Sequence, residues 1–208
     1  ENTEDLYAGV EFNTVPDKLR DTLTELSPPF KAFKDLPGDQ YAISCKINTK
    51  AGSERIVRAA FAFARRHGRK KVTVVHKANV VRATDGMFLE IAKDVASRYP
   101  EIIFDDANVD AMTMWLLKNP LSYDVLVAPN LYGDIISDLC AQMVGGLGFA
   151  CSGNIGDALA VFEPSHGSAP KYAGQNKVNP TATSRTARMM PDSLGGKDMA
   201  ARLERATA

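Results

Sequence analysis

The stretch Val-Thr-Val-Val-His-Lys at residues 72–77 constrains the fold more than any other part of the chain. Its apolar residues run together instead of alternating with polar ones, which is typical of a strand buried on both faces of a parallel sheet. A second such strand is expected at residues 123–128. Apolar residues recur at a helical spacing between these strands, at residues 84–99, and before them, at residues 53–68. This order predicts an α/β fold with a mostly parallel sheet flanked by helices.

Residues 14–40 fit neither pattern, because four prolines and a glycine interrupt them. A structureless stretch of this length is uncommon inside a compact domain unless it has a partner. The flanking segments, residues 1–12 and 41–49, alternate weakly and are expected to be strands. We therefore expect a projecting arm at about residues 5–48 that pairs with a second subunit in a dimer.

Composition excludes several classes of function. The 25 basic and 25 acidic residues balance, and no run of five like charges occurs, so nothing favours nucleic acid or an anionic membrane. The sequence has no apolar run of 18 residues and no signal peptide. Cys45, Cys140 and Cys151 lack a C-x-x-C spacing, so a reducing, cytoplasmic location is expected. Because the chain begins at Glu1 rather than Met, we expect it to be a piece of a longer protein.

Asp134 and Asp138 are the first candidates for a functional site. They lie four residues apart after the strand at residues 123–128, so they share one face near the start of a helix. Paired carboxylates suit a hard cation such as Mg²⁺ or Mn²⁺. The spacing is equally consistent with a solvated helix start, where acids are favoured by the helix dipole. The dipole interpretation is the stronger one for Asp110, in the first turn of the preceding helix.

Three further side chains are candidates for chemistry. Lys77 follows the buried strand, where open parallel sheets hold ligands, although a surface lysine at a sheet edge is an equally good interpretation. Tyr7 lies in the first expected strand and is either a packing residue or an acid. The loop at residues 163–170 could offer backbone amides and His166 to a nucleotide. The glycines at residues 145–156 do not follow the G-x-G-x-x-G pattern, so an ordinary dinucleotide fingerprint is not predicted.

Five motifs together carry a family resemblance. They are ENTEDLYAGVE at the start, HKAN at 76–79, NLYGDIISD at 130–138, GGLG at 145–148 and HGSAPKYAGQNKVNP at 166–180. Their order and spacing over about residues 1–183 resemble the downstream half of an enzyme of the isocitrate/isopropylmalate (β-decarboxylating) dehydrogenase family. The Glu-Asp pair at residues 4 and 5 resembles the members that use isocitrate.

The resemblance implies a division into domains. Residues 1–145 would form the small domain, which includes the arm, and residues 146–208 would be the C-terminal part of the large cofactor-binding domain. The rest of that domain, with the serine and arginines that bind substrate, would lie upstream, so the chain alone is expected to be inactive. Residues 184–196 depart from the apolar helix expected there. Pro191 would cost about 3 kcal/mol inside a helix, and Ser184 and Arg185 would place polar groups on its buried face.

The resemblance also implies the chemistry. Isocitrate would be oxidised by hydride transfer to a nicotinamide and then decarboxylated with the help of a metal. Asp134 and Asp138 would bind Mg²⁺ or Mn²⁺, joined by Asp110 from the other subunit of a homodimer. Lys77, also reaching across the dimer, and Tyr7 would transfer protons. The residues implied for the cofactor are Asn79, His166, Gly167, Ser168, Ala169, Pro170, Lys171, Tyr172, Val178 and Asn179.

The dipeptide Lys171-Tyr172 bears on the choice of cofactor. It resembles NADP-dependent members, because an ammonium group can hold a 2′-phosphate, whereas NAD-dependent members often carry an acid that accepts from the ribose hydroxyl. NADP is therefore expected over NAD. The alternatives are a 3-isopropylmalate, homoisocitrate or tartrate dehydrogenase, or a non-catalytic regulatory subunit of a hetero-oligomeric dehydrogenase. The presence of Tyr7, Lys77 and the three acids argues against a regulatory subunit.

Overall fold

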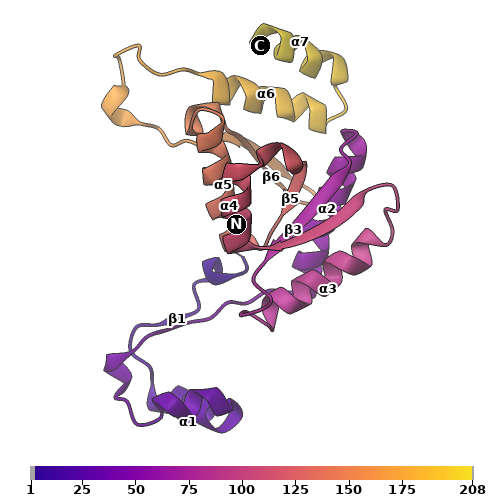
Figure 1. Cartoon of the computed structure of the whole chain (residues 1–208). Coiled ribbons are helices and arrows are strands. Elements are labelled where there is room, and N and C mark those ends of the chain that lie inside the picture. The colour runs from indigo at the N-terminus through magenta and orange to yellow at the C-terminus, as the bar shows by residue number, and fades with distance from the viewer. Residues whose placement is uncertain (1–2, 208) are drawn as a thin grey trace. The chain divides into compact units, whose positions relative to one another are not determined.

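The fold is described from a computed structural model in which residues 3–207 are placed (Figure 1). The chain forms two compact units, Glu1–Gly133 and Asp134–Ala208. The boundary between the units falls inside one helix, α5 (Asn130–Met143). The division into domains at residues 145 and 146 stays a prediction.

The first unit is built on a three-stranded parallel sheet. β3 (Lys71–His76) lies in the middle, between β4 (Ile103–Asn108) and β5 (Val125–Val127). All three strands run in the same direction. The five residues from Val72 to His76 are all buried, as the uninterrupted apolar run predicts. The expected α/β fold with a parallel sheet is confirmed.

Helices α2 (Lys50–Arg66) and α3 (Thr84–Ala96) pack against each other and against β3, and α4 (Val109–Lys118) contacts β3 and β4. The core between them is apolar and consists of Val57, Phe61, Ala64, Val72, Val74, Phe88, Ala92, Val95, Ile102 and Val127. Its helical members recur at three and four residues, which is the periodicity that predicts these helices.

Helix α2 begins before the expected start at Ser53. The backbone N–H of Gly52 donates to Thr49 Oγ1 at 3.0 Å, so Thr49 is the N-cap. Glu4 reinforces this start, because its carboxylate accepts from both the backbone N–H and the hydroxyl of Thr49. Glu4 is therefore tied to the beginning of α2.

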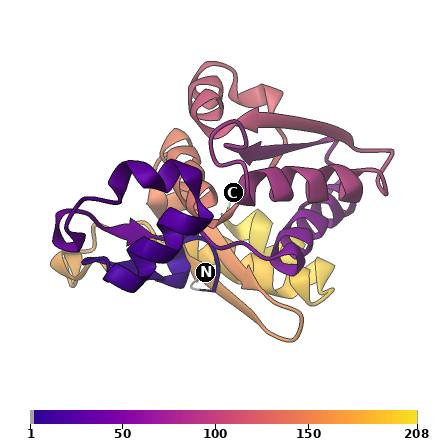
Figure 2. The same cartoon turned by 90° about the horizontal axis from the view of Figure 1, so that it is seen from below.

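The arm projects from the sheet of the first unit (Figures 1 and 2). β1 (Glu11–Phe12) and β2 (Ile43–Ser44) form an antiparallel pair at its base. Between them lie α1 (Asp17–Leu26), η2 (Pro28–Phe33) and η3 (Gly38–Gln40), where no regular structure was expected. The prolines begin or precede these short elements, which is where a proline is tolerated.

Of the strand expected at residues 1–12, the first two residues lie outside the described part of the chain, Leu6–Ala8 form a 3₁₀ turn, η1, and only Glu11–Phe12 are a strand. Asp5 has a φ of 65°, and its carboxylate accepts from the backbone N–H of Leu6 at 2.8 Å. Gly9 follows the turn with a φ of 68°. Two residues with positive φ thus flank the segment, so the strand can only start after Gly9.

The second unit continues from α5 through η5 (Leu147–Phe149) to an antiparallel pair, β6 (Cys151–Ile155) and β7 (Ala160–Pro164). A long loop with the short turn η6 (Pro170–Tyr172) then leads to α6. α6 (Thr181–Ser193) packs on both strands and on α7 (Lys197–Thr207).

Residues 184–193, which depart from the apolar pattern expected there, nevertheless belong to a helix, α6. The helix includes Pro191, but only two helical residues follow it, so the lost backbone bond lies in the last turn. The buried positions of the helix are Ala182, Thr186 and Pro191, while Arg185 is exposed. The expectation that Ser184 and Arg185 lie on the buried face is therefore wrong for Arg185, whereas Ser184 is half-buried.

The core predicts a stability difference between two phenylalanines of α2. Phe61 is buried, whereas Phe63 is 50% exposed. Phe61→Ala should lower the free energy of unfolding by about 3–5 kcal/mol, and Phe63→Ala by less than about 1 kcal/mol. Urea unfolding followed by the fluorescence of the single tryptophan, Trp115, measures both. Equal losses would contradict this placement of the core.

Candidate active site

Lys77 and Asp110 meet at the carboxyl ends of β3 and β4. Lys77 follows β3 directly, and Asp110 lies in the first turn of α4, directly after β4. Lys77 Nζ donates to Asp110 Oδ1 at 2.5 Å. This hydrogen bond is the main reason that the pKa of Asp110 lies below its ordinary value. Lys77 and Asp110, which the family resemblance assigns to one active site, thus form an ion pair on the surface of a single chain.

The backbone around Lys77 is held by several bonds. The backbone N–H of Val81 donates to the carbonyl of Lys77 at 2.8 Å. The backbone N–H of Ala78 donates to His76 Nδ1 at 3.0 Å, and His76 Nε2 lies 3.0 Å from Asp106 Oδ2. Because Nδ1 accepts, Nε2 carries the proton and donates to Asp106. The turn that presents Lys77 is therefore well defined.

A buried carboxylate, Asp85, completes this turn. The backbone N–H of Lys77 donates to Asp85 Oδ2 at 2.7 Å, and Asp85 is fully buried. Tyr132 also bonds to Asp85; burial, and then the charge of Asp85, raises the pKa of Tyr132 to about 12, so its hydroxyl remains a donor. The sequence reasoning did not single out Asp85, because an acid in the first turn of a helix ordinarily serves the dipole.

Tyr7 lies in η1 and is half-buried. The neighbouring pair Glu4 and Asp5 has structural contacts at the start of α5. The side-chain amide of Asn130 donates to the carbonyl of Glu4 at 3.5 Å, and the backbone N–H of Leu131 to Asp5 Oδ2 at 3.4 Å. The segment with Tyr7 is thereby fixed to the first turn of α5.

Asp134 and Asp138 share α5 and are both exposed. Ile136, which lies between them in the sequence, is buried, so the opposite side of the helix packs against the protein. The hydroxyl of Ser137 donates to the backbone carbonyl of Asp134 at 2.9 Å. Two exposed carboxylates one turn apart can offer oxygen ligands from the same side of a helix.

The donor set fits a hard divalent cation. Mg²⁺ and Mn²⁺ prefer carboxylate and water oxygens, and often take one or two carboxylates plus groups of a substrate. Among residues 3–207 no group of three or more His, Cys, Asp or Glu side chains is close enough to hold a metal. Asp134 and Asp138 would need further ligands from water, a substrate or a second copy of the chain.

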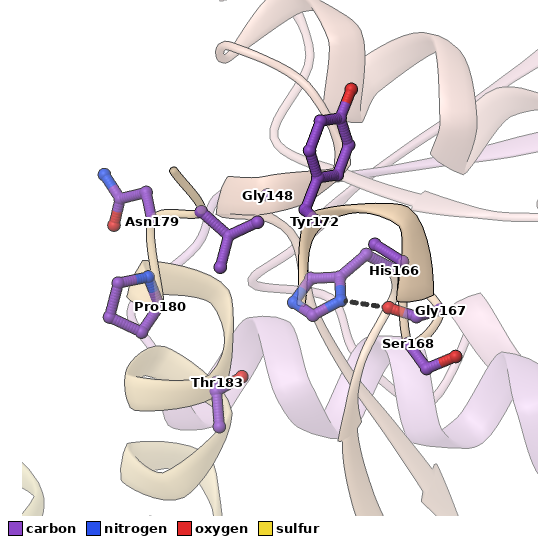
Figure 3. A pocket seen from close by; sticks show the side chains of 10 residues that line it. Gly148, His166, Gly167, Ser168, Tyr172, Asn179, Pro180 and Thr183 are labelled. Carbon is purple, nitrogen blue, oxygen red and sulfur yellow. Dashed lines mark hydrogen bonds between the residues drawn. The ribbon is translucent and has the colours of Figure 1, made fainter. Parts of the chain in front are cut away.

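A cavity of about 520 Å³ lies in the second unit (Figure 3). The loop after β7, the turn η6 and the beginning of α6 surround it. Its lining residues are Gly148, His166, Gly167, Ser168, Ala169, Tyr172, Val178, Asn179, Pro180 and Thr183. The volume is in the range of small-molecule sites. Of the residues implied for the cofactor in this unit, all but Pro170 and Lys171 line the cavity.

His166 and Asn179 have defined orientations at the cavity (Figure 3). His166 Nδ1 lies 2.8 Å from the carbonyl oxygen of Gly167. A carbonyl only accepts, so Nδ1 carries the proton and Nε2 of the neutral ring is an acceptor. Asn179 Oδ1 accepts from the backbone N–H of Thr181 at 3.0 Å and from its hydroxyl at 2.5 Å, and so satisfies the first N–H of α6, whose N-cap is Pro180.

Three cofactor candidates do not line the cavity: Pro170, Lys171 and Asn79. Lys171 is exposed, and its Nζ lies 4.9 Å from the centre of the Tyr172 ring. Asn79 is exposed in the turn after β3, in the first unit. Sequence reasoning missed Pro180 and Thr183 as lining residues; the start of a helix directly after Asn179 was the available signal.

Comparison with known proteins decides the family. The model of the family described as isocitrate/isopropylmalate dehydrogenase matches residues 1–208. The chain belongs to this family. A crystal structure of isocitrate dehydrogenase from Methylococcus capsulatus has 46% identity and a TM-score of 0.82, over 99% of this chain and 55% of that one. The family match extends beyond residue 183, where the resemblance in the sequence was expected to end.

Curated relatives in this dehydrogenase family differ in the activity they are named for. A Caenorhabditis elegans protein, named as the probable mitochondrial alpha subunit of isocitrate dehydrogenase (NAD), is 45% identical over 99% of this chain and 51% of its own length. The 3-isopropylmalate dehydrogenase of Archaeoglobus fulgidus is 43% identical over 99% and 56%. A Dictyostelium discoideum protein, named as a mitochondrial regulatory subunit of isocitrate dehydrogenase (NAD), is 44% identical over 94% and 49%. The chain spans about half the length of these relatives.

The names of these relatives bear on two expectations, the cytoplasmic location and the preference for NADP. The cytoplasmic location is wrong, because the isocitrate dehydrogenases from C. elegans and D. discoideum are named as mitochondrial. Cysteine spacing only indicates a reducing compartment and cannot tell one such compartment from another. The preference for NADP finds no support in names that specify NAD. In the part of the chain that the structure describes, no helix is long and apolar enough to span a bilayer.

The pairing of Lys77 with Asp110 predicts a change in titration. Lys77→Met removes the donor that stabilises the Asp110 carboxylate, so the pKa of Asp110 should rise toward its ordinary value. Carboxyl NMR titration of Asp110 measures this. Lys118→Met, at the other end of α4, should leave the Asp110 titration unchanged. An unchanged pKa in Lys77→Met would show that the two side chains do not meet.

Proposed function

We propose that this chain is part of a metal-dependent isocitrate dehydrogenase that converts isocitrate to 2-oxoglutarate with reduction of a nicotinamide dinucleotide. The observation that carries the proposal is the cavity in the second unit, which gathers the residues of the HGSAPKYAGQNKVNP motif around one space. Relatives named for isocitrate and for 3-isopropylmalate have similar identities, 45% and 43%, so identity alone does not select the substrate. The Glu-Asp pair at residues 4 and 5, which resembles the isocitrate-using members, favours isocitrate.

Asp134 and Asp138 would hold Mg²⁺ or Mn²⁺ in this enzyme. When bound, the metal supplies a Lewis acid that polarises the oxygen of the substrate carbon undergoing oxidation. The chain contributes two carboxylates fixed on one helix, and Asp110 of a second copy would add a third. A site with ligands from two copies needs a dimer, which gives the arm a role in holding two chains together.

Lys77 and Tyr7 would move the protons. Oxidation of the hydroxyl requires a base to take its proton, and the enol left after loss of carbon dioxide requires an acid to protonate its carbon. Lys77 would act as the base and the Tyr7 phenol as the acid. Because Lys77 and Asp110 form a pair within one chain, they would enter the site of a second copy together.

The cavity would hold the adenosine part of the cofactor. It is lined by backbone and small side chains of the loop, and His166 and Tyr172 contribute aromatic rings. The Nε2 acceptor of His166 suits a donor such as the exocyclic amine of adenine. The glycine and alanine of the loop let the backbone come close to the ligand.

A regulatory subunit is the second candidate function, favoured by the 44% identity to the D. discoideum protein named for that role. The candidate acids and Lys77 would have no role in a subunit without turnover. Full-length protein assayed without any other subunit distinguishes the two, because a regulatory subunit would show no isocitrate turnover by itself.

The metal assignment predicts the effect of Asp134→Asn in the full-length protein. Loss of a first ligand should lower kcat/KM by more than the roughly 10- to 100-fold typical of changes around a metal ligand. Circular dichroism should show an unchanged fold, since the Asp134 side chain does not belong to the buried core. Glu90→Gln, which removes an exposed acid paired with Lys93 on α3, serves as the control. Unchanged metal-dependent turnover in Asp134→Asn would refute the assignment.

Lys171 and Tyr172 are proposed to select between NADP and NAD. The Lys171 ammonium suits the 2′-phosphate of NADP, so kcat/KM should be higher for NADP than for NAD. The double variant Lys171→Asp, Tyr172→Ile should reverse the ratio, because a carboxylate repels the phosphate and accepts from the ribose hydroxyl. A preference for NAD in the unaltered protein would agree with the names of the relatives and overturn this part of the proposal.

A further inference from the structure

Lys46, from the end of the arm, lies among three groups of the first unit. Its Nζ is 2.5 Å from Asp85 Oδ1 and 3.8 Å from Asp5 Oδ2, and it lies 4.3 Å from the centre of the Tyr132 ring. Both carboxylates have 0% exposed side chains, and the lysine side chain is 14% exposed. A cation is thus enclosed by two buried anions and an aromatic face, which attracts it further. We refer to these four residues as the Lys46 cluster.

The carboxylates of the cluster also bind donors that belong to the proposed active site. Asp85 Oδ2 accepts from the backbone N–H of Lys77, and the hydroxyl of Tyr132 bonds to Asp85. Asp5 accepts from the backbone N–H of Leu131, in the first turn of α5. Buried acids are tolerated where their oxygens have such partners.

The cluster connects segments that are far apart in the sequence. Asp5 adjoins the turn that carries Tyr7, and Lys46 ends the arm. Asp85 holds the turn that carries Lys77, and Tyr132 lies in the first turn of α5. The turns that carry Tyr7 and Lys77 are therefore both attached, through backbone, to one ion-paired centre.

We propose that Lys46 is a positioning residue, which acts by holding the Asp85 carboxylate against the backbone of Lys77. This inference rests on the proposed function, in which Lys77 transfers a proton. Without the ammonium, two buried carboxylates would face each other with no cation between them, and at least one would have to move or become neutral. Asp85 is the carboxylate closer to Lys46, so the turn of Lys77 would be the first to shift.

A purely structural ion pair is the competing explanation, and the chain offers a matched control for it. Lys71 Nζ lies 3.3 Å from Asp105 Oδ2 and 4.9 Å from the Tyr123 ring. Like Lys46, Lys71 contacts an aspartate and a tyrosine ring, but its ion pair is more exposed, with 25% of the lysine and 43% of the aspartate side chain accessible. It belongs to the opposite, amino end of β3, away from Lys77.

The test compares Lys46→Met, Lys46→Arg and Lys71→Met in the full-length protein. Lys46→Met should lower kcat for isocitrate by about 10- to 100-fold with KM nearly unchanged, because the proton-transfer group is misplaced while substrate binding is retained. Lys46→Arg keeps a cation and should recover most of the loss. Lys71→Met should leave kcat per folded molecule near that of the unaltered protein.

Amide hydrogen exchange gives a reading that does not depend on activity. In Lys46→Met the exchange rate of the Lys77 amide should rise about tenfold or more, while that of Thr73, in the middle of β3, stays the same. No turnover by the unaltered protein would refute the proposed function, yet the exchange rates would still test the cluster.

Three results would overturn the inference. They are an unchanged kcat in folded Lys46→Met, an unchanged exchange rate at Lys77, or an equal loss of kcat in Lys71→Met. Asp85→Asn keeps the shape of the side chain and serves as a second variant, with the same expected fall in kcat. If neither Lys46→Met nor Asp85→Asn folds, the cluster is a structural requirement and not a positioning device.

Discussion

The parallel pairing of β3 with β4 and β5 is the interaction on which the rest of the first unit depends. Burial of β3 on both faces requires helices on both sides of the sheet, and α2, α3 and α4 meet this requirement. Parallel pairing also brings the carboxyl ends of all three strands to one edge. Lys77, Asp110 and Asn130 follow these ends, so residues separated by 33 and 20 positions in the sequence arrive at the same edge.

Elements with a strong apolar period could be predicted from the sequence, and elements defined by single contacts could not. The run at residues 72–77 and the helices around it follow from burial alone. The turn at residues 6–8 depends on the backbone of Asp5, and the first residue of α2 depends on Thr49 and Glu4. Pro191 was misleading because its cost depends on its distance from the end of α6, which the sequence pattern does not give.

The residues of the candidate site likewise fall into those that a sequence motif could predict and those that only the tertiary fold brings together. The loop from His166 to Asn179 is continuous in the sequence, and the motif was sufficient to name most of the residues that line the cavity. Lys46, Asp85 and Tyr132 are separated by 39 and 47 positions, and only Tyr132 lies in one of the five motifs, NLYGDIISD. Their association is a product of the tertiary fold, as is usual for a buried polar cluster.

The φ of 65° at Asp5 limits how this position can vary among related proteins. With a ψ of −150° Asp5 lies outside the left-handed helical region, in a part of the backbone map that is essentially open only to glycine, so the aspartate is strained there. Glycine would relax the backbone but would leave Lys46 with one anion instead of two, and asparagine would keep the shape without the charge. Substitutions at residues 5 and 46 are therefore expected to be correlated among related proteins. A relative with glycine at position 5 is expected to carry a different charge at position 46.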